Sequence, residues 1–99
     1  MAIMTVEITM NDNDISLVGE LTQQTISHAL EKKAKAFFQK KNVVINLAGI
    51  KKVDTAGLAW LLTLVELASI NTCTIGFTHL SEELQNLAKL TAVDAFLPS

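Results

Sequence analysis

The sequence predicts an α/β fold, a four-stranded mixed sheet with helices packed on it, in the element order β-β-α-β-α-β-α. Three observations support this fold class. Strand-like runs alternate with helical periodicity. The turn formers at residues 11–14 separate two short strands, which predicts an antiparallel hairpin. Two later β-α-β units predict parallel strand pairs. A length of 99 residues fits a single domain, residues 1–99, and the hydrophobic content of 49% is enough for a core without disulfides.

The first half of the chain provides the hairpin, a helix and a central strand. Residues 3–10 alternate in part between apolar and polar side chains, and residues 15–18 form a second apolar run. Thr22 can cap a helix, and apolar residues then recur at spacings of three and four as far as Phe38, which predicts an amphipathic helix of about four turns. The dense β-branched run at residues 43–47 predicts a buried central strand.

The second half of the chain provides two further helices and a strand. Residues 48–55 are predicted to form a loop at the carboxyl end of the central strand, where α/β sheets commonly build their sites. A helix then runs to about residue 70, and residues 73–78 form the last strand. Ser81 is expected to cap a third helix. The tail, residues 91–99, is expected to pack back on the body as a short turn or helix.

Composition and charge exclude several classes of function. The net charge is −2 and the isoelectric point about 5.5, which does not favour a nucleic-acid binder. The single cysteine, Cys73, rules out an intrachain disulfide, is expected to be a small packed residue, and fits a reducing compartment. We find no signal-peptide pattern and no apolar run of the roughly 20 residues needed to span a bilayer. We therefore expect a cytoplasmic protein.

The residue types that catalysis needs are not grouped in this sequence. It has no glycine-rich phosphate loop and no recognisable nucleophile pair. His28 and His79 are predicted to lie far apart, which gives no metal site. Asp54 beside Thr55 could pass for a catalytic pair, but no base or oxyanion donor accompanies it. We therefore expect no metal, no cofactor and no enzymatic activity.

The helix that begins near Asp54 is apolar almost all the way round. At about 100° per residue, one side gathers Leu58, Leu61, Leu62, Val65 and Ala68 and is predicted to face the core. The opposite side gathers Ala56, Trp60, Thr63, Leu64 and Leu67. An exposed apolar face that includes a tryptophan predicts a partner-binding surface. In the alternative, a flanking helix or the C-terminal tail covers this face.

The start of this helix and the preceding helix carry two further signals. Asp54 or Thr55 can cap the helix, and Gly57 permits close approach of another backbone. The preceding helix ends in Lys32, Lys33, Lys35, Lys40 and Lys41. These lysines are interpreted first as a solvated face that complements the helix dipole, and second as a contact for an anionic membrane or an acidic partner.

With the element order, two motifs make the sequence resemble the STAS domain, the fold of anti-sigma-factor antagonists. Residues 19–21 (Gly-Glu-Leu) follow the second strand, and residues 53–58 (Val-Asp-Thr-Ala-Gly-Leu) open the second helix. Within this family, the chain looks closer to MlaB, the STAS subunit of the Mla phospholipid-transport ABC complex of Gram-negative envelopes. The further similarities are Gly57-Leu58-Ala59, the Leu-rich helix, residues 87–90 and Leu97-Pro98.

This resemblance implies a non-enzymatic subunit that binds and supports an MlaF-like ATPase at the inner-membrane face, in a complex with permease and substrate-binding subunits that maintains outer-membrane lipid asymmetry. The implied partner contacts are Asp54, Thr55, Ala56, Gly57, Trp60, Thr63, Leu64 and Leu67. On this hypothesis Trp60→Glu should abolish ATPase binding and leave the fold intact. The alternative is an anti-sigma-factor antagonist in which Thr55 is the phosphoacceptor, although Ala56 stands where such antagonists often have a second serine.

Overall fold

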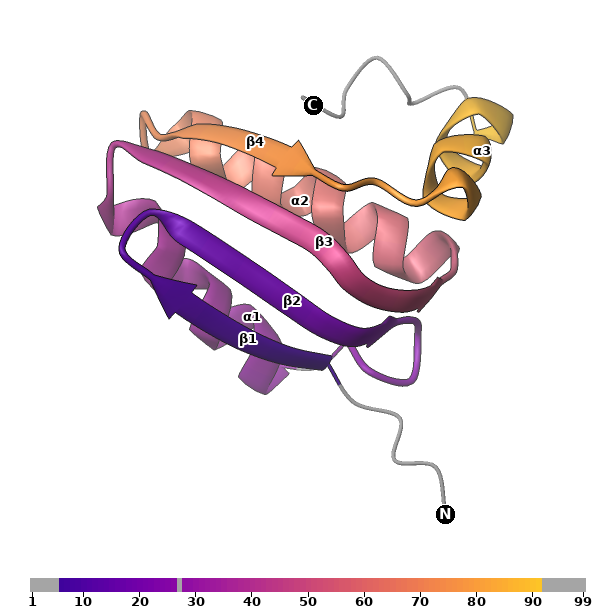
Figure 1. Ribbon diagram of the computed structural model, residues 1–99. Helices are drawn as coiled ribbons and strands as arrows, with labels where there is room; N and C mark the ends of the chain where they lie inside the picture. The colour runs from indigo at the N-terminus through magenta and orange to yellow at the C-terminus, as the bar shows by residue number, and fades with distance from the viewer. Residues whose placement is uncertain (1–5, 27, 92–99) are drawn as a thin grey trace.

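The computed structural model describes residues 6–26 and 28–91 and has the mixed four-stranded sheet that the sequence predicts (Figure 1). In chain order, its elements are β1 (Val6–Asn11), β2 (Asp14–Leu21), α1 (His28–Lys35), the 3-10 helix η1 (Ala36–Gln39), β3 (Asn42–Val53), α2 (Thr55–Ile70), β4 (Thr74–Thr78) and α3 (Glu82–Leu90). The strands lie in the order β1-β2-β3-β4. β1 is antiparallel to β2, whereas the β2–β3 and β3–β4 pairs are parallel. The fold class and the strand directions are therefore confirmed.

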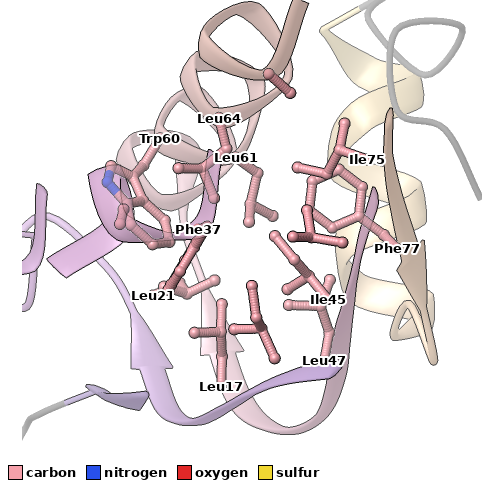
Figure 2. Close-up of a cluster of buried hydrophobic side chains, with 14 of the residues drawn as sticks. Leu17, Leu21, Phe37, Ile45, Leu47, Trp60, Leu61, Leu64, Ile75 and Phe77 are labelled. Atoms are coloured by element: carbon pink, nitrogen blue, oxygen red, sulfur yellow. The ribbon is translucent and has the colours of Figure 1, made fainter. Parts of the chain in front are cut away.

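One face of the sheet is covered and the other is open. Helices α1 and α2 lie side by side on the same face (Figure 1). Alternate strand residues point toward them and are buried, namely Ile15, Leu17, Leu21, Val43, Ile45, Leu47, Ile75 and Phe77. On the uncovered face, Val18 and Val44 are 46% and 37% exposed. The hydrophobic core thus lies between the sheet and the two helices (Figure 2).

The first helix begins later than the sequence predicts. Thr22 does not cap it, because residues 22–25 form a turn in which the Thr22 carbonyl accepts from the backbone N–H of Thr25 and of Ile26, at 3.0 and 3.1 Å. The Thr25 hydroxyl oxygen also accepts from the Thr22 N–H at 3.0 Å. Threonine hydroxyls offer the backbone local hydrogen bonds that compete with a helix, and the Thr25 hydroxyl forms such a bond here. The described helix α1 starts at His28.

The central strand is longer than expected. Instead of forming a loop at residues 48–55, β3 continues to Val53, which pairs with Leu21 at the end of β2. Two register shifts between these strands, one beside Gly19, break the regular alternation that would have identified the extension. Gly19 has a φ of 122°, a conformation that glycine adopts readily and other residues rarely do. This extension brings the end of β3 against the turn that follows β2.

Several smaller predictions can also be compared with the structure. Ser81 caps α3, because its hydroxyl accepts from the Leu84 N–H at 3.0 Å. Cys73 is buried immediately before β4, and this burial raises the pKa of its thiol. Residues 3–5 of the first predicted strand and residues 92–99 of the predicted tail lie outside the described residues.

Candidate partner-binding surface on helix α2

The start of α2 is joined to the end of β2 by hydrogen bonds. The Asp54 N–H donates to the Leu21 carbonyl at 3.1 Å. In the opposite direction, the Gln23 N–H donates to Asp54 Oδ2 at 3.0 Å, and the Gly57 N–H donates to Asp54 Oδ1 at 3.0 Å. Asp54 is therefore the N-cap of α2, one of the two residues that the sequence allowed for this role, and its carboxylate links two segments that are 31 residues apart.

These contacts also set the charge state of Asp54. The Gln23 N–H, followed by that of Gly57, holds the pKa of this carboxyl below its ordinary value of 3.8, because both N–H groups stabilise the ionised form. Partial burial opposes this shift and does not reverse it. With its two oxygens occupied inside the fold, Asp54 positions the start of α2. It is not presented as a free carboxylate.

Gly57 allows this close approach of α2 and β2. A Cβ atom at this position would lie 2.0 Å from the Leu21 carbonyl oxygen and 2.7 Å from its carbon, far inside contact distance. Gly57 is buried, so its role lies in the packing of α2 on the end of β2. Gly57 was expected to touch a partner, but as a buried residue it can only affect such a contact indirectly, by positioning α2.

Thr55 is in the opposite situation, at the surface. It is the first residue of α2 and is exposed, and its hydroxyl makes no hydrogen bond within the part of the chain that the structure describes. Because Asp54 supplies the cap, the Thr55 hydroxyl is not needed for capping. The structure thus separates two roles that the sequence left open between these neighbours.

The expected exposure of Trp60 and Leu64 is wrong. Trp60 is only 4% exposed and Leu64 is fully buried. Figure 2 shows both side chains in the core cluster, to which Phe37 and Leu21 also belong. A charge at position 60 would therefore be buried in the folded chain itself. The Trp60→Glu variant should unfold the protein and cannot serve as a specific test of partner binding.

The physical reason for this burial is helix α1. Side chains from both helices line one small hollow, to which α1 contributes Glu31, Ala34 and Lys35 and α2 contributes Trp60, Thr63, Leu64 and Leu67. The flank of α2 that the sequence assigned to a partner therefore faces α1. This outcome is the flanking-helix alternative that the sequence left open. On this flank Leu67 and Ala56 remain partly exposed, and Thr63 is exposed.

The residues that α2 presents to solvent differ from those expected. The exposed positions are Thr55, Ala59, Thr63, Glu66, Ser69 and Ile70. Beside them, Leu62 and Val65 are partly exposed, although the sequence placed them in the core. With Glu66 and Ser69 they line a shallow surface hollow of about 370 Å³. The candidate surface, called the outer face of α2 below, consists of Thr55, Ala59, Leu62, Thr63, Val65 and Glu66.

A signal for this orientation was present in the sequence. The polar residues of the helix are few, and Thr55, Thr63, Glu66 and Ser69 fall within about 120° of one another at 100° per residue. On an otherwise apolar helix, such a polar stripe marks the solvent side. The apolar residues could not show the orientation, because they occupy both flanks of the stripe.

Two observations concern metal sites and membrane spans in the described residues. No group of three or more His, Cys, Asp or Glu side chains that could hold a metal ion occurs within residues 6–26 and 28–91. None of the helices in that part of the chain has the length and apolar character that crossing a bilayer would require.

Three solved structures to which this chain is similar are those of anti-sigma-factor antagonists. SpoIIAA in its unphosphorylated form superposes with a TM-score of 0.63 at 12% identity, over 93% of this chain and 84% of that one. Phosphorylated SpoIIAA from Bacillus gives 0.66 at 10% identity, over 93% and 87%. An anti-sigma factor antagonist from Mycobacterium paratuberculosis gives 0.66 at 22% identity, over 94% and 81%. The arrangement of strands and helices is therefore the STAS fold.

The family within that fold follows from the sequence match. Residues 4–98 match the family model described as "Mlab, STAS domain". The chain belongs to this family, as the motifs at residues 19–21 and 53–58 indicate. No curated protein matches the chain.

Proposed function

We propose that this chain is a non-enzymatic binding subunit that docks on the ATPase of an ABC-type phospholipid transporter, at the inner-membrane face. The match of residues 4–98 to the MlaB STAS family carries this proposal. The outer face of α2 supplies a surface suited to it, since small and apolar side chains lie there beside Thr55 and Glu66. Such a mixture is typical of a docking surface and lacks the grouped polar residues of an active site.

The proposed contact is centred differently from the one expected from sequence. Thr55 and Thr63 are retained because both are exposed, and Ala59, Leu62 and Val65 take the place of the buried Trp60 and Leu64 as the small and apolar part of the surface. Asp54 and Gly57 support the surface from within by fixing the start of α2.

Ala59→Glu tests this contact. Ala59 is exposed in the middle of the outer face, and glutamate forms helices well, so the fold should tolerate the change. An unpaired carboxylate buried in the complex should weaken binding to the purified ATPase subunit at least tenfold. Titration calorimetry or fluorescence anisotropy would measure the affinity.

Ala36→Glu is the matched control, because Ala36 is also exposed but belongs to η1. It should bind the ATPase as the wild type does. Equal affinities for wild type and Ala59→Glu would remove the outer face of α2 from the contact. A wild-type chain that does not bind the ATPase at all would overturn the proposed function itself.

A second candidate function is favoured by the exposed hydroxyl of Thr55. In an anti-sigma-factor antagonist, phosphorylation there would add a charge of about −1.5 to −2 at the edge of the outer face of α2 and weaken a complex formed on it. The same ATPase titration discriminates between the two functions when it is paired with a kinase assay. A phosphate on Thr55 after incubation with an anti-sigma kinase and ATP, found by mass spectrometry, would favour the antagonist.

A further inference from the structure

A group of lysines on and beside α1 has no role in the contact described above. We propose that this lysine stripe docks on the anionic surface of a phospholipid bilayer. The stripe consists of Lys32, Lys33, Lys35, Lys40 and Lys41. The inference rests on the proposed function only in that a transporter subunit works beside a membrane, and it is tested without the ATPase.

The charge of the chain is distributed unevenly. Residues 32–41 carry five lysines and no acidic residue, whereas the other residues carry three lysines and ten acidic residues. A net-acidic protein should be repelled by an anionic surface unless it presents one basic region to it. The stripe is such a region, and it occupies a single helix and the short segment that leads into β3.

The stripe is exposed and little neutralised. Lys32, Lys33, Lys35 and Lys41 are exposed, and they form no salt bridge within the described part of the chain. Lys40 lies 3.7 Å from the carboxylate of Asp12, which is 88% exposed. Such an exposed pair is weak and exchanges easily for another anion. The ammonium groups are therefore available to lipid headgroups.

An apolar side chain is exposed at the same end of the molecule. Ile70, the last residue of α2, is 70% exposed. The segment that follows it returns to Lys41, whose carbonyl accepts from the Thr74 N–H at 2.8 Å. A basic region with an exposed aliphatic side chain at the same end of the molecule is typical of surfaces that bind at the headgroup boundary. The capped start of α2 lies at the other end of that helix from Ile70.

The chemistry of the stripe favours a bilayer over an acidic protein. All of its cations are lysines, and the chain contains no arginine. Arginine supplies the planar, bidentate geometry that fixed carboxylates in protein interfaces select. Lysines on flexible stems act as separate point charges, which suits mobile headgroups with no fixed spacing.

Co-sedimentation with vesicles tests the proposal. The full-length chain would be mixed with phosphatidylethanolamine vesicles that contain phosphatidylglycerol, and separately with phosphatidylcholine vesicles. Binding should occur on the anionic vesicles at an ionic strength of about 20 mM and weaken at about 150 mM, because salt screens exposed charges. A lysine at such a surface strengthens binding about fivefold, so Lys32→Gln with Lys33→Gln should weaken it about 25-fold.

Lys51→Gln with Lys52→Gln is the matched control, because it changes the net charge equally on two exposed lysines outside the stripe, in β3. It should reduce binding less than twofold. A wild-type chain that ignores anionic vesicles at low salt would overturn the proposal, as would equal losses in the two double variants or equal binding to phosphatidylcholine. ATPase affinity, measured without lipid, should be the same for both double variants, so failure here is distinct from failure of the proposed function.

Discussion

The two flanks of helix α2 have similar amino-acid compositions and opposite environments. One flank carries Trp60 and Leu64, which are buried against α1 and the sheet. The other carries Leu62 and Val65, which are partly exposed beside a shallow hollow. Both flanks are apolar, so hydrophobicity alone does not decide which one enters the core. The position of a neighbouring helix decides it.

This difference separates stability from binding along a single helix. Side chains on the α1 flank contribute to the core, and their loss should unfold the protein. Leu62 and Val65, on the far flank, pack against the edge of the core but keep part of their surface exposed, and that part remains available to a partner. The rotation of α2 about its own axis is fixed at its start, where Asp54 and Gly57 hold it against the end of β2. Substitutions on either flank of α2, or at the start of the helix, therefore test the difference between its buried and its partly exposed flank.

The largest effect is expected from Trp60→Ala. Removing a buried tryptophan leaves a cavity and should lower the free energy of unfolding by about 3–5 kcal/mol. Leu62→Ala, on the partly exposed flank, should lower it by about 1 kcal/mol or less. Urea denaturation followed by circular dichroism would measure both. Equal losses of unfolding free energy in the two variants would contradict the difference in burial between the two flanks.

Much of the fold could be predicted from local patterns in the sequence. The polar run at residues 11–14, the β-branched strand at residues 43–47 and the caps at Asp54 and Ser81 each depend on side chains close in sequence. The extension of β3 to Val53 depends on pairing with β2 across register shifts, which no local period displays. The turn at residues 22–25 could not be predicted for a different reason, which is that threonine is common both as a helix cap and in turns.

The candidate site was predicted in position but not in orientation. The sequence placed the candidate surface on the helix that begins near Asp54, and Asp54 is the N-cap of that helix. Trp60 was assigned to the surface because the periodicity of a single helix cannot show where a second helix will lie. The contact between α1 and α2 is tertiary, so the sequence could only leave it open as an alternative. The stripe that includes Thr55, Thr63 and Glu66 was the better guide.

An intermediate effect is expected from Gly57→Ala, which tests what sets the rotation of α2. The added methyl would lie 2.0 Å from the Leu21 carbonyl oxygen, so the helix or the end of β2 must move. Overpacking against backbone should exceed the gain in helix propensity and lower the free energy of unfolding by about 2 kcal/mol. Ala59→Gly, an exposed position two residues further on, is the control and should cost about 1 kcal/mol by propensity alone.

Thermal or urea denaturation of the two variants makes this comparison direct. If Gly57→Ala were as stable as the wild type, the close approach of α2 to β2 would not be needed. If it were destabilised and also bound the ATPase more weakly, the loss of binding would show that the outer face of α2 depends on how the start of the helix is held.

The smallest effect is expected from Asp54→Asn, and it depends on pH. The amide oxygen can keep one of the two hydrogen bonds but not both, so the free energy of unfolding at pH 7 should fall by about 1 kcal/mol. The pKa of Asp54 is lowered in the folded chain, so the native state binds fewer protons than the unfolded state near pH 4. Its contribution is therefore present above the ordinary value of 3.8 and is lost as the pH falls through the lowered pKa.

The difference in the free energy of unfolding between wild type and Asp54→Asn should accordingly be largest at neutral pH. It should shrink below pH 3.8, as the wild-type carboxyl is protonated. Urea denaturation of both proteins across this range gives the difference directly, and the other carboxylates cancel in it. A difference independent of pH would mean that the ionised carboxylate is not what holds Gln23 and Gly57. The packing of Gly57 on Leu21 would then be what fixes the start of α2, while the neighbouring helix α1 still sets which flank is buried.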